Sequence, residues 1–244
     1  MPDVSIVVPA YNEGPAIVGC LDQLLGSVAS DCEVLVVVDS PDDSTLPFVE
    51  EYAAGDPRVV PTLNTYGRGP AKAIRFGMDR STSPVTVVTM ADGSDEVSKI
   101  DEMAANVRDG AVVCAASRYM RGGSQVGGPP VKRLMSRLAG LSLWWVGRVG
   151  THDATNSFKA YSTSFVRQAG VESDAGFEIG LELVAKAKRM GLRTVEVPTR
   201  WVDRTEGASN FKLAKWLPRY LRWYWVALGP RTRGPLAPQH PVED

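Results

Sequence analysis

Three groups of acidic and polar side chains stand out because each directly follows a short apolar run. They are Tyr11-Asn12-Glu13, Asp39 through Asp43, and Asp92 through Glu96. If the apolar runs are parallel strands of one sheet, these groups meet in the crevice outside the carboxyl ends of the strands, where such sheets bind ligands. Asp, Asn and Ser also favour helix N-caps. Each group alone fits capping about as well, but the coincidence of three favours a ligand site.

The elements that would position these groups alternate along the chain. Continuous β-branched runs predict strands, and apolar residues every three or four positions predict helices. Strands are expected at Val4–Val8, Glu33–Val38, Arg58–Leu63, Val85–Met90, Gly110–Ser117 and Thr194–Val202, and helices at Glu13–Val28, Leu46–Ala54, Ala71–Met78, Val131–Gly147, Phe177–Met190 and Lys212–Leu228. Strands without polar alternation, separated by helices, indicate an α/β fold with a mostly parallel sheet covered on both faces.

Composition and charge narrow the class of protein. The chain has 244 residues, 44% of them hydrophobic, and a formal net charge of −1. These values are typical of a globular α/β protein and give no electrostatic case for nucleic-acid binding. No stretch approaches the ~20 apolar residues of a spanning helix. The first apolar run lacks a preceding basic segment, so we expect a strand there rather than a signal peptide.

The three cysteines, Cys20, Cys32 and Cys114, show neither a metal-binding spacing nor a neighbouring histidine. Such thiols usually behave as small core residues. We therefore expect them to be free, in a reducing compartment without disulfides or structural zinc. The protein is expected to be cytoplasmic, either soluble or peripheral on a membrane.

A series of motifs over about residues 4 to 225 carries a family resemblance. PAYNE, EVLVVVDSPDDST and MADGSDE occur in the order found in inverting family-2 glycosyltransferases, and resemble their motifs. AASRY, KRLMSR, DATNSFKAYS and GFEIGLELVAKAKRMGLRTVEVPTRWVDRTEGAS resemble the branch of dolichol- and polyprenyl-phosphate hexose synthases. The resemblance implies a single GT-A domain, expected over residues 1–211, followed by an amphipathic helix over 212–228 and a disordered tail over 229–244.

The resemblance also implies a nucleotide-sugar donor, a GDP- or UDP-hexose, bound together with Mg²⁺ or Mn²⁺. Pro9, Tyr11 and Glu13 correspond to the nucleotide-binding edge of the family, and Asp39 to a residue near the base or ribose. Asp92 corresponds to the last acid of the Asp-X-Asp metal motif. It is the expected metal ligand and catalytic residue, because a divalent cation supplies charge to the departing diphosphate.

The rest of the metal motif departs from the family pattern. Met90 replaces the first acid, and Ser94 stands where the branch has a third oxygen ligand, so Ser94 is the second expected metal ligand. Asp95 is an alternative ligand. Asp95 and Glu96 also fit an acidic pair at a helix N-terminus, where the helix dipole favours negative charge.

The acceptor side separates two kinds of enzyme. A sugar hydroxyl needs a general base, whereas a lipid phosphate is already anionic and needs charged hydrogen-bond donors. By resemblance Arg118 and Ser136 would bind an acceptor phosphate, more so than the pair Lys132 and Arg133. Asp153 is either a base or a structural anchor, and a phosphate acceptor favours the anchor.

Two residues near the end of the chain are also expected in the site. Arg204 and Ser209 resemble a mobile segment of the family that closes over the diphosphate. The lead function is inverting transfer of a hexose to a polyprenyl phosphate. The alternatives are a glycosyltransferase with a hydroxyl acceptor, and a nucleotide-sugar-binding protein without turnover, the latter motivated by Met90 and by Asn210 in place of the family's Lys.

The stretch Lys212–Leu228 interleaves aromatic and basic residues, a composition that suits the surface of a bilayer. We expect this helix to lie in the membrane interface, on the cytoplasmic face, with a kink or a helix start at Pro218. The alternatives are a helix docked on the domain and a homodimer contact. Its aromatic residues are Trp216, Tyr220, Trp223, Tyr224 and Trp225, and its cations are Lys212, Lys215, Arg219 and Arg222.

Overall fold

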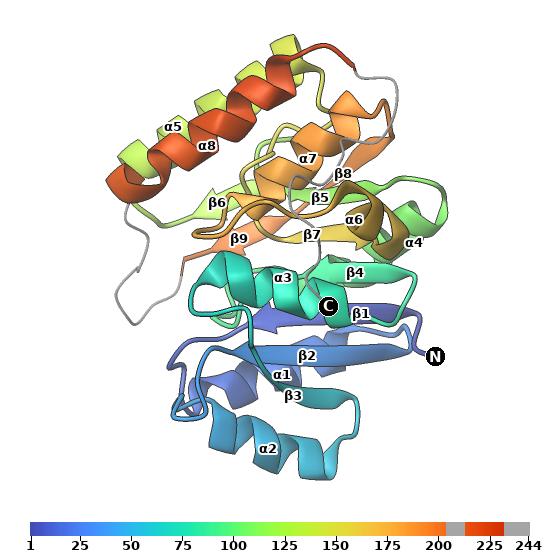
Figure 1. Cartoon of the computed structure of the whole chain (residues 1–244), viewed down its shortest axis with the longest axis vertical. Coiled ribbons are helices and arrows are strands. Elements are labelled where there is room, and N and C mark those ends of the chain that lie inside the picture. The colour runs from blue at the N-terminus through green and yellow to red at the C-terminus, as the bar shows by residue number, and fades with distance from the viewer. Residues whose placement is uncertain (204–212, 232–244) are drawn as a thin grey trace.

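A seven-stranded sheet runs through the computed structural model of the chain, which describes residues 1–203 and 213–231 (Figure 1). The strand order is β3 (Val59–Leu63), β2 (Cys32–Val38), β1 (Val4–Pro9), β4 (Val85–Val88), β7 (Lys159–Ser162), β5 (Val113–Ser117) and β8 (Thr194–Pro198). Only β7 is antiparallel to its neighbours in this sheet of described residues. The predicted single α/β domain with a mostly parallel sheet is confirmed.

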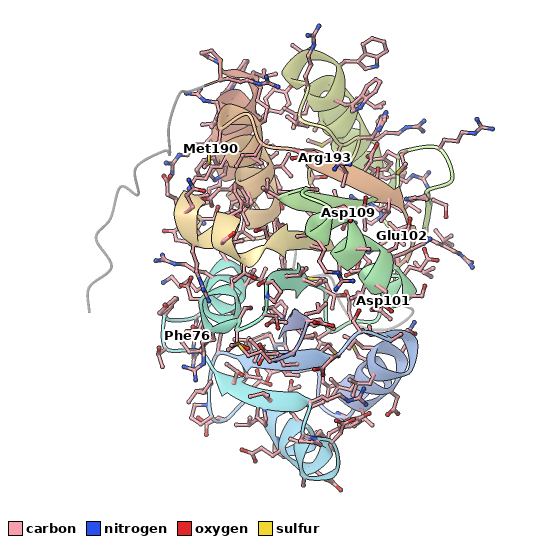
Figure 2. The ribbon with its side chains drawn as sticks, turned by 90° about the vertical axis from the view of Figure 1, so that its right-hand side faces the viewer. Phe76, Asp101, Glu102, Asp109, Met190 and Arg193 are labelled. Carbon is pink, nitrogen blue, oxygen red and sulfur yellow. The ribbon has the colours of Figure 1, made fainter. Side chains whose placement is uncertain are left out.

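Helices cover both faces of the sheet, so each face has its own apolar core. On one side lie α1 (Ala16–Ser27), η1 (Val97–Lys99) and α4 (Ile100–Arg108), and on the other α3 (Pro70–Arg80), α6 (Thr163–Ala169) and α7 (Ile179–Arg189). Figure 2 shows Asp101 and Glu102 on α4 and Phe76 on α3 at opposite sides of the sheet. Ile6 and Val7 of β1 belong to different cores. This two-sided burial explains the continuous apolar strands.

The end of the molecule beyond β8 carries two neighbouring helices. There, α5 (Pro130–Ser142) and its π-helical continuation η2 (Leu143–Gly147) lie beside α8 (Leu213–Leu228), far from α2 (Leu46–Gly55) at the other end (Figure 1). The hydroxyls of Ser142 and Tyr224 join α5 to α8 at 2.9 Å. Within the described ranges, no helix combines the length and the apolar character needed to cross a bilayer.

The predicted strand Thr194–Val202 is two strands. Pro198 ends β8, and after Thr199 the chain continues as β9 (Arg200–Val202), which pairs in parallel with β6 (Ser124–Val126) in a separate small sheet. The last bond to β5 comes one residue later, where the N–H of Thr199 donates to the carbonyl of Ser117 at 3.2 Å, while the carbonyl of Thr199 already accepts a hydrogen bond from the N–H of Ser124 at 2.9 Å. The chain therefore passes from the main sheet to the small sheet at Thr199. Periodicity alone does not reveal this break.

Gly77 of α3 allows the helix to approach the sheet closely. A Cβ built at this position would overlap the side chain of Val7 and lie 3.1 Å from a methyl of Val37. Gly19, on the exposed side of α1, has open space around the same position.

These two glycines give a matched test of this packing. Gly77→Ala should destabilise the protein by about 1–3 kcal/mol through overpacking. Gly19→Ala should be neutral or stabilise it by up to ~1 kcal/mol, because alanine is the better helix former. Urea unfolding of both variants measures the difference. Equal stability of the two variants would contradict the close packing of α3 on β1.

Candidate active site

The three polar groups predicted to converge do lie at one edge of the sheet. They follow β1, β2 and β4, which are adjacent parallel strands and therefore end at the same edge. The carboxyl end of β5 and the start of the antiparallel β7 lie along this edge as well. The sheet thus brings the expected nucleotide, metal and acceptor residues to one side of the molecule.

The turn after β1 is fixed by the turn after β2. Buried Asp43 accepts hydrogen bonds from the N–H of Asn12 at 3.1 Å and of Thr45 at 2.8 Å. The Thr45 hydroxyl accepts one from the N–H of Glu13 at 3.0 Å. Asn12 has a positive φ of 53°, a conformation in which asparagine is enriched. Asp43 therefore fixes the conformation of the turn after β1, where nucleotide binding is predicted.

Two expected nucleotide-binding residues differ in exposure. Pro9 is buried at the end of β1, whereas the Tyr11 ring beyond it is 60% exposed. Tyr11 is therefore not a core ring, and its face is available to a ligand. A role of Pro9, Tyr11 and Glu13 in donor binding stays a prediction.

Asp39, at the end of β2, anchors the glycine-bearing loop before α3. One of its carboxylate oxygens accepts a hydrogen bond from the Asn64 amide at 2.7 Å, and the other from the N–H of Gly69 at 2.7 Å. Gly69 has a φ of 127°, which strongly favours glycine. Asp39 thus has a clear structural role, and contact with the base or ribose stays a prediction.

In the segment 90–95, where a metal motif is expected, Asp92 has the one carboxylate that is not buried. Asp92 is half-buried, and its Oδ1 accepts a hydrogen bond from the N–H of Ser94 at 3.1 Å, while Oδ2 has no such partner among the described residues. Ser94 is 4% exposed. The described residues contain no group of three or more His, Cys, Asp or Glu placed to hold a metal ion. Mg²⁺ often uses only one or two carboxylates plus phosphates and water, so Asp92 fits a metal held jointly with a diphosphate.

Asp95 does not replace the acid missing at Met90. It is 4% exposed, and its Oδ2 accepts hydrogen bonds from the Thr89 hydroxyl at 3.0 Å and the N–H of Met90 at 3.1 Å. Burial raises the pKa of Asp95 to about 6; the Met90 N–H lowers it and the Asp92 carboxylate adds to the rise. The buried Asp95 side chain therefore stabilises the loop on which Asp92 lies, through its hydrogen bonds to Thr89 and Met90.

Arg118, directly after β5, and Asp153 form a buried ion pair at this edge. Nε and Nη2 of Arg118 donate to the two oxygens of Asp153 at 2.7 and 2.9 Å, and the Arg118 N–H donates to the same carboxylate at 3.1 Å. The side chains are 11% and 0% exposed. Burial favours the neutral form of Asp153, but the Arg118 charge outweighs it and lowers the pKa of Asp153. The prediction that Asp153 is an anchor agrees with this geometry.

The same guanidinium reaches the predicted Ser136. Nη2 of Arg118 donates to the Ser136 hydroxyl at 3.3 Å, and that hydroxyl lies 2.6 Å from the one of Thr155. The structure therefore brings Arg118 and Ser136 together, although they are 18 residues apart. Nη1 of Arg118 makes no hydrogen bond to another described residue. Arg118 thus keeps two donors after Asp153 and Ser136 are satisfied.

A cavity of about 480 Å³ opens beside Arg118. Arg133 and Arg137 of α5 line it together with Arg118, and among the residues that the structure describes its lining includes no Asp, Glu or His. The other lining residues are Tyr119, Met120, Gly123, Ser124, Gln125, Pro130 and Leu134.

Several residues of this region were not singled out from the sequence. The Tyr119 and Trp201 rings lie 5.0 and 5.9 Å from the Arg118 guanidinium, so Arg118 contacts two aromatic rings. Arg137 falls one helical turn after Arg133 on α5, a spacing that does place the two side chains on one helix face. Trp201 lies 83 positions from Arg118, and no local pattern predicts that contact. The expected Arg204 and Ser209 lie outside the described residues.

The pH dependence of stability tests the burial of Asp95. Its folded pKa of about 6 exceeds the ordinary 3.8, so protonation favours the folded state. That contribution is complete below pH ~4 and is lost as pH rises through 6. Asp95→Asn keeps an acceptor oxygen and does not titrate. In EDTA, its unfolding free energy relative to wild type should therefore increase from pH 4 to 7, by on the order of 2 kcal/mol. A difference that stays constant across this range contradicts the burial.

Comparison with known proteins is consistent with this arrangement. The profile of "Glycosyl transferase family 2" matches residues 5–170, more than half of the chain. The polyprenol monophosphomannose synthase of Mycolicibacterium smegmatis is 29% identical over 231 residues, covering 86% of this chain and 85% of that protein. The undecaprenyl-phosphate mannosyltransferase of Micrococcus luteus is 28% identical, covering 85% and 86%. The dolichol-phosphate mannosyltransferase of Pyrococcus furiosus is 28% identical over 90% of this chain and 62% of its own length.

Solved structures support the fold. The glucosyl-3-phosphoglycerate synthase of Mycobacterium tuberculosis, in complex with Mn²⁺, UDP and phosphoglyceric acid, superposes with a TM-score of 0.65 over 94% of this chain and 79% of that one, at 17% identity. A second crystal structure of that enzyme contains Mg²⁺ and UDP, with the same TM-score. The sheet order, the convergent edge and the family match lead to one conclusion: this chain is a glycosyltransferase of family 2 with the GT-A fold.

Proposed function

We propose that this chain transfers a hexose from a GDP- or UDP-sugar to a polyprenyl phosphate, with inversion and with Mg²⁺ or Mn²⁺. The observation that carries this proposal is the cavity beside Arg118, whose described lining holds three arginines and no carboxylate or imidazole. Such a lining suits an anionic acceptor. A hydroxyl acceptor would require a general base, and the described part of the lining offers no carboxylate or imidazole for that role.

The ion pair with Asp153 prepares Arg118 for a phosphate. Asp153 fixes Nε and Nη2 of the guanidinium, which leaves Nη1 to donate to an acceptor oxygen. A preorganised guanidinium binds phosphate through strong, charge-assisted hydrogen bonds. Because Asp153 is fully buried and held as a carboxylate by Arg118, it is poorly placed to accept a proton from a substrate. Arg133 and Arg137 add charge along the same cavity.

The donor would lie across the edge formed by β1, β2 and β4. Tyr11 offers an exposed ring to the base, and the Asp39 turn borders the ribose. A divalent cation would be held by Asp92 with the donor's own phosphates, and it would neutralise charge on the leaving diphosphate. Arg204 and Ser209 would close over that diphosphate.

The relatives support the acceptor class. Two relatives that match over most of their length are named for mannosyl transfer to a polyprenol or undecaprenyl phosphate, and one that matches over 62% of its length for dolichol phosphate. The lipid phosphate of these relatives is the acceptor that we propose for this chain.

The acceptor assay uses radiolabelled GDP- and UDP-hexoses with a polyprenyl phosphate or the matching prenol, followed by organic extraction. We expect transfer to the phosphate only, and its loss in EDTA. Arg137→Ala should raise the acceptor KM by about tenfold, the size of one charged hydrogen bond, with donor affinity unchanged. Arg108→Ala, at an exposed position near the end of α4, is the matched control.

Equal transfer to the prenol would contradict a phosphate acceptor and favour a hydroxyl acceptor. Full activity in EDTA would contradict the proposed requirement for a divalent metal ion. Nucleotide binding without any transfer across the panel would point to a binding protein without turnover. If Arg137→Ala lowered the affinity for the donor as much as the affinity for the acceptor, Arg137 would not be specific to the acceptor and would contribute to donor binding.

We also propose that the chain works at the cytoplasmic face of a membrane through α5, η2 and α8. Six large apolar side chains of α5 and η2 are exposed: Val131, Leu134, Met135, Leu138, Trp145 and Val146. Between Asp109 and Asp153 the sequence has six cations and no acid, which suits anionic lipid. The three cysteines are free and buried, in keeping with a reducing compartment.

The structure changes which residues of α8 suit this role. Trp223 is 4% exposed and packs with Lys186 and Arg222, whereas Trp225 is 66% exposed. One face of α8 is therefore docked on the domain, as in the alternative interpretation of this helix, and the Trp223 ring packs inside the protein rather than facing outward. The apolar surface offered to lipid comes mainly from α5 and η2.

Flotation with anionic vesicles tests the membrane surface. Trp145→Ala/Val146→Ala removes two side chains that are 71% and 72% exposed, so folding should be unaffected while vesicle binding falls by about tenfold. Leu63→Ala, on β3 at the other end of the molecule, should bind like wild type. Added salt should weaken the binding. A double variant that floats like wild type would contradict this surface.

A further inference from the structure

The strand β9 lies between the loop that carries Asp92 and the strand β6 of the acceptor cavity. We propose that β9 couples the donor side to the acceptor side, and that Glu96 is the positioning residue that holds β9 in place. This inference rests on the proposed function, because it assigns the two ends of the coupling to the donor metal and the acceptor phosphate.

The loop side of β9 is held by two residues that closely follow Asp92. Glu96 Oε2 accepts a hydrogen bond from the N–H of Arg200 at 2.6 Å and from the Thr199 hydroxyl at 3.4 Å. The carbonyl of Ser94 accepts one from the N–H of Val202 at 3.1 Å. The N–H groups of Arg200 and Val202 thus point to the loop that carries Asp92. The shorter of these two bonds is the one to the carboxylate of Glu96. Glu96 makes no capping bond to the helical turn η1 that follows it.

The other side of β9 is bound to β6. The N–H of Ser124 donates to the carbonyl of Thr199, and the N–H of Asp203 to the carbonyl of Val126, both at 2.9 Å. The alternation follows from parallel pairing, in which successive residues of a strand bond to opposite neighbours. Arg200 and Val202 therefore bond to the metal loop through their N–H groups. A shift of that loop is transmitted to β6 through a strand of only three residues.

The β6 side reaches the acceptor cavity directly. Ser124 and Gln125 line the cavity, and β6 continues through the positive-φ glycines Gly127 and Gly128 into α5, the helix of Arg133 and Arg137. Trp201, in the middle of β9, lies 5.9 Å from the Arg118 guanidinium. The position of β9 therefore affects two parts of the cavity lining, the strand β6 and the side chain of Arg118.

This arrangement predicts positive coupling between the two substrates. A metal and a diphosphate on Asp92 would order the loop through Glu96, and the loop would order β9 and the cavity. Coupling free energies are reciprocal, so each ligand should raise the affinity for the other by the same factor, typically 5 to 150-fold. A merely structural Glu96 would change stability without changing that factor.

The binding experiment measures the affinity of geranyl phosphate by calorimetry, with and without GDP or UDP plus Mn²⁺. We expect the nucleotide and metal to tighten binding by about fivefold or more in the wild type. Glu96→Ala should reduce this factor to about one, while Glu96→Gln, which keeps an acceptor oxygen, should retain most of it. Glu102→Ala, on the exposed surface of α4 (Figure 2), is the matched control and should behave like wild type.

Amide hydrogen exchange tests whether nucleotide and metal order β9 and β6 when no acceptor substrate is present. Nucleotide and Mn²⁺ should slow exchange at residues 124–126 and 200–203 in the wild type and in Glu96→Gln, but not in Glu96→Ala. The inference is overturned if exchange there is unchanged in the wild type, or if Glu96→Ala keeps the full coupling. Failure of geranyl phosphate to bind, with the exchange pattern intact, would instead count against the proposed acceptor and leave the role of Glu96 supported.

Discussion

The buried ion pair between Arg118 and Asp153 is the interaction on which the rest of the edge depends. An unpaired charge in this position would cost several kcal/mol, so the end of β5, the loop before β7 and the side chain of Ser136 must all stay where the pair is satisfied. The pair contributes little to stability by itself, because desolvation offsets most of the attraction. Its effect is on position: one fixed guanidinium with two remaining donors faces a cavity, 5.0 and 5.9 Å from the rings of Tyr119 and Trp201.

The sheet edge divides into two regions of opposite charge. Asp39, Asp43, Asp92 and Asp95 follow β2 and β4, whereas the stretch from Asp109 to Asp153 has six cations and no acid between its ends. A departing diphosphate needs a cation, which a single outward carboxylate can help to hold. An incoming phosphate needs fixed donors rather than a base. The division of charge therefore matches the two anionic groups of the proposed reaction, and β9 is the element that touches both regions.

Local patterns predicted much of the fold but not the contacts between distant segments. Apolar runs such as Val4–Val8 and Glu33–Val38 indicated parallel strands, because burial on both faces removes polar alternation. That rule also placed the turns of Asp39 and Asp92 at one edge. The hydrogen bonds that Glu96 accepts from Thr199 and Arg200 span more than 100 residues, and the burial of Trp223 depends on docking against α7. Neither has a periodic signal, since both arise only after the chain has folded.

The most direct measurement is a crystal structure of the protein with a nucleotide diphosphate, Mn²⁺ and geranyl phosphate. We expect the prenyl phosphate to lie in the cavity between β6 and α5, within hydrogen-bond distance of Nη1 of Arg118, with the Arg118–Asp153 pair intact. We also expect the metal to be bound by Asp92. A phosphate bound outside this cavity, or an Arg118 that leaves Asp153 to contact the nucleotide, would contradict the assignment of Arg118 to the acceptor.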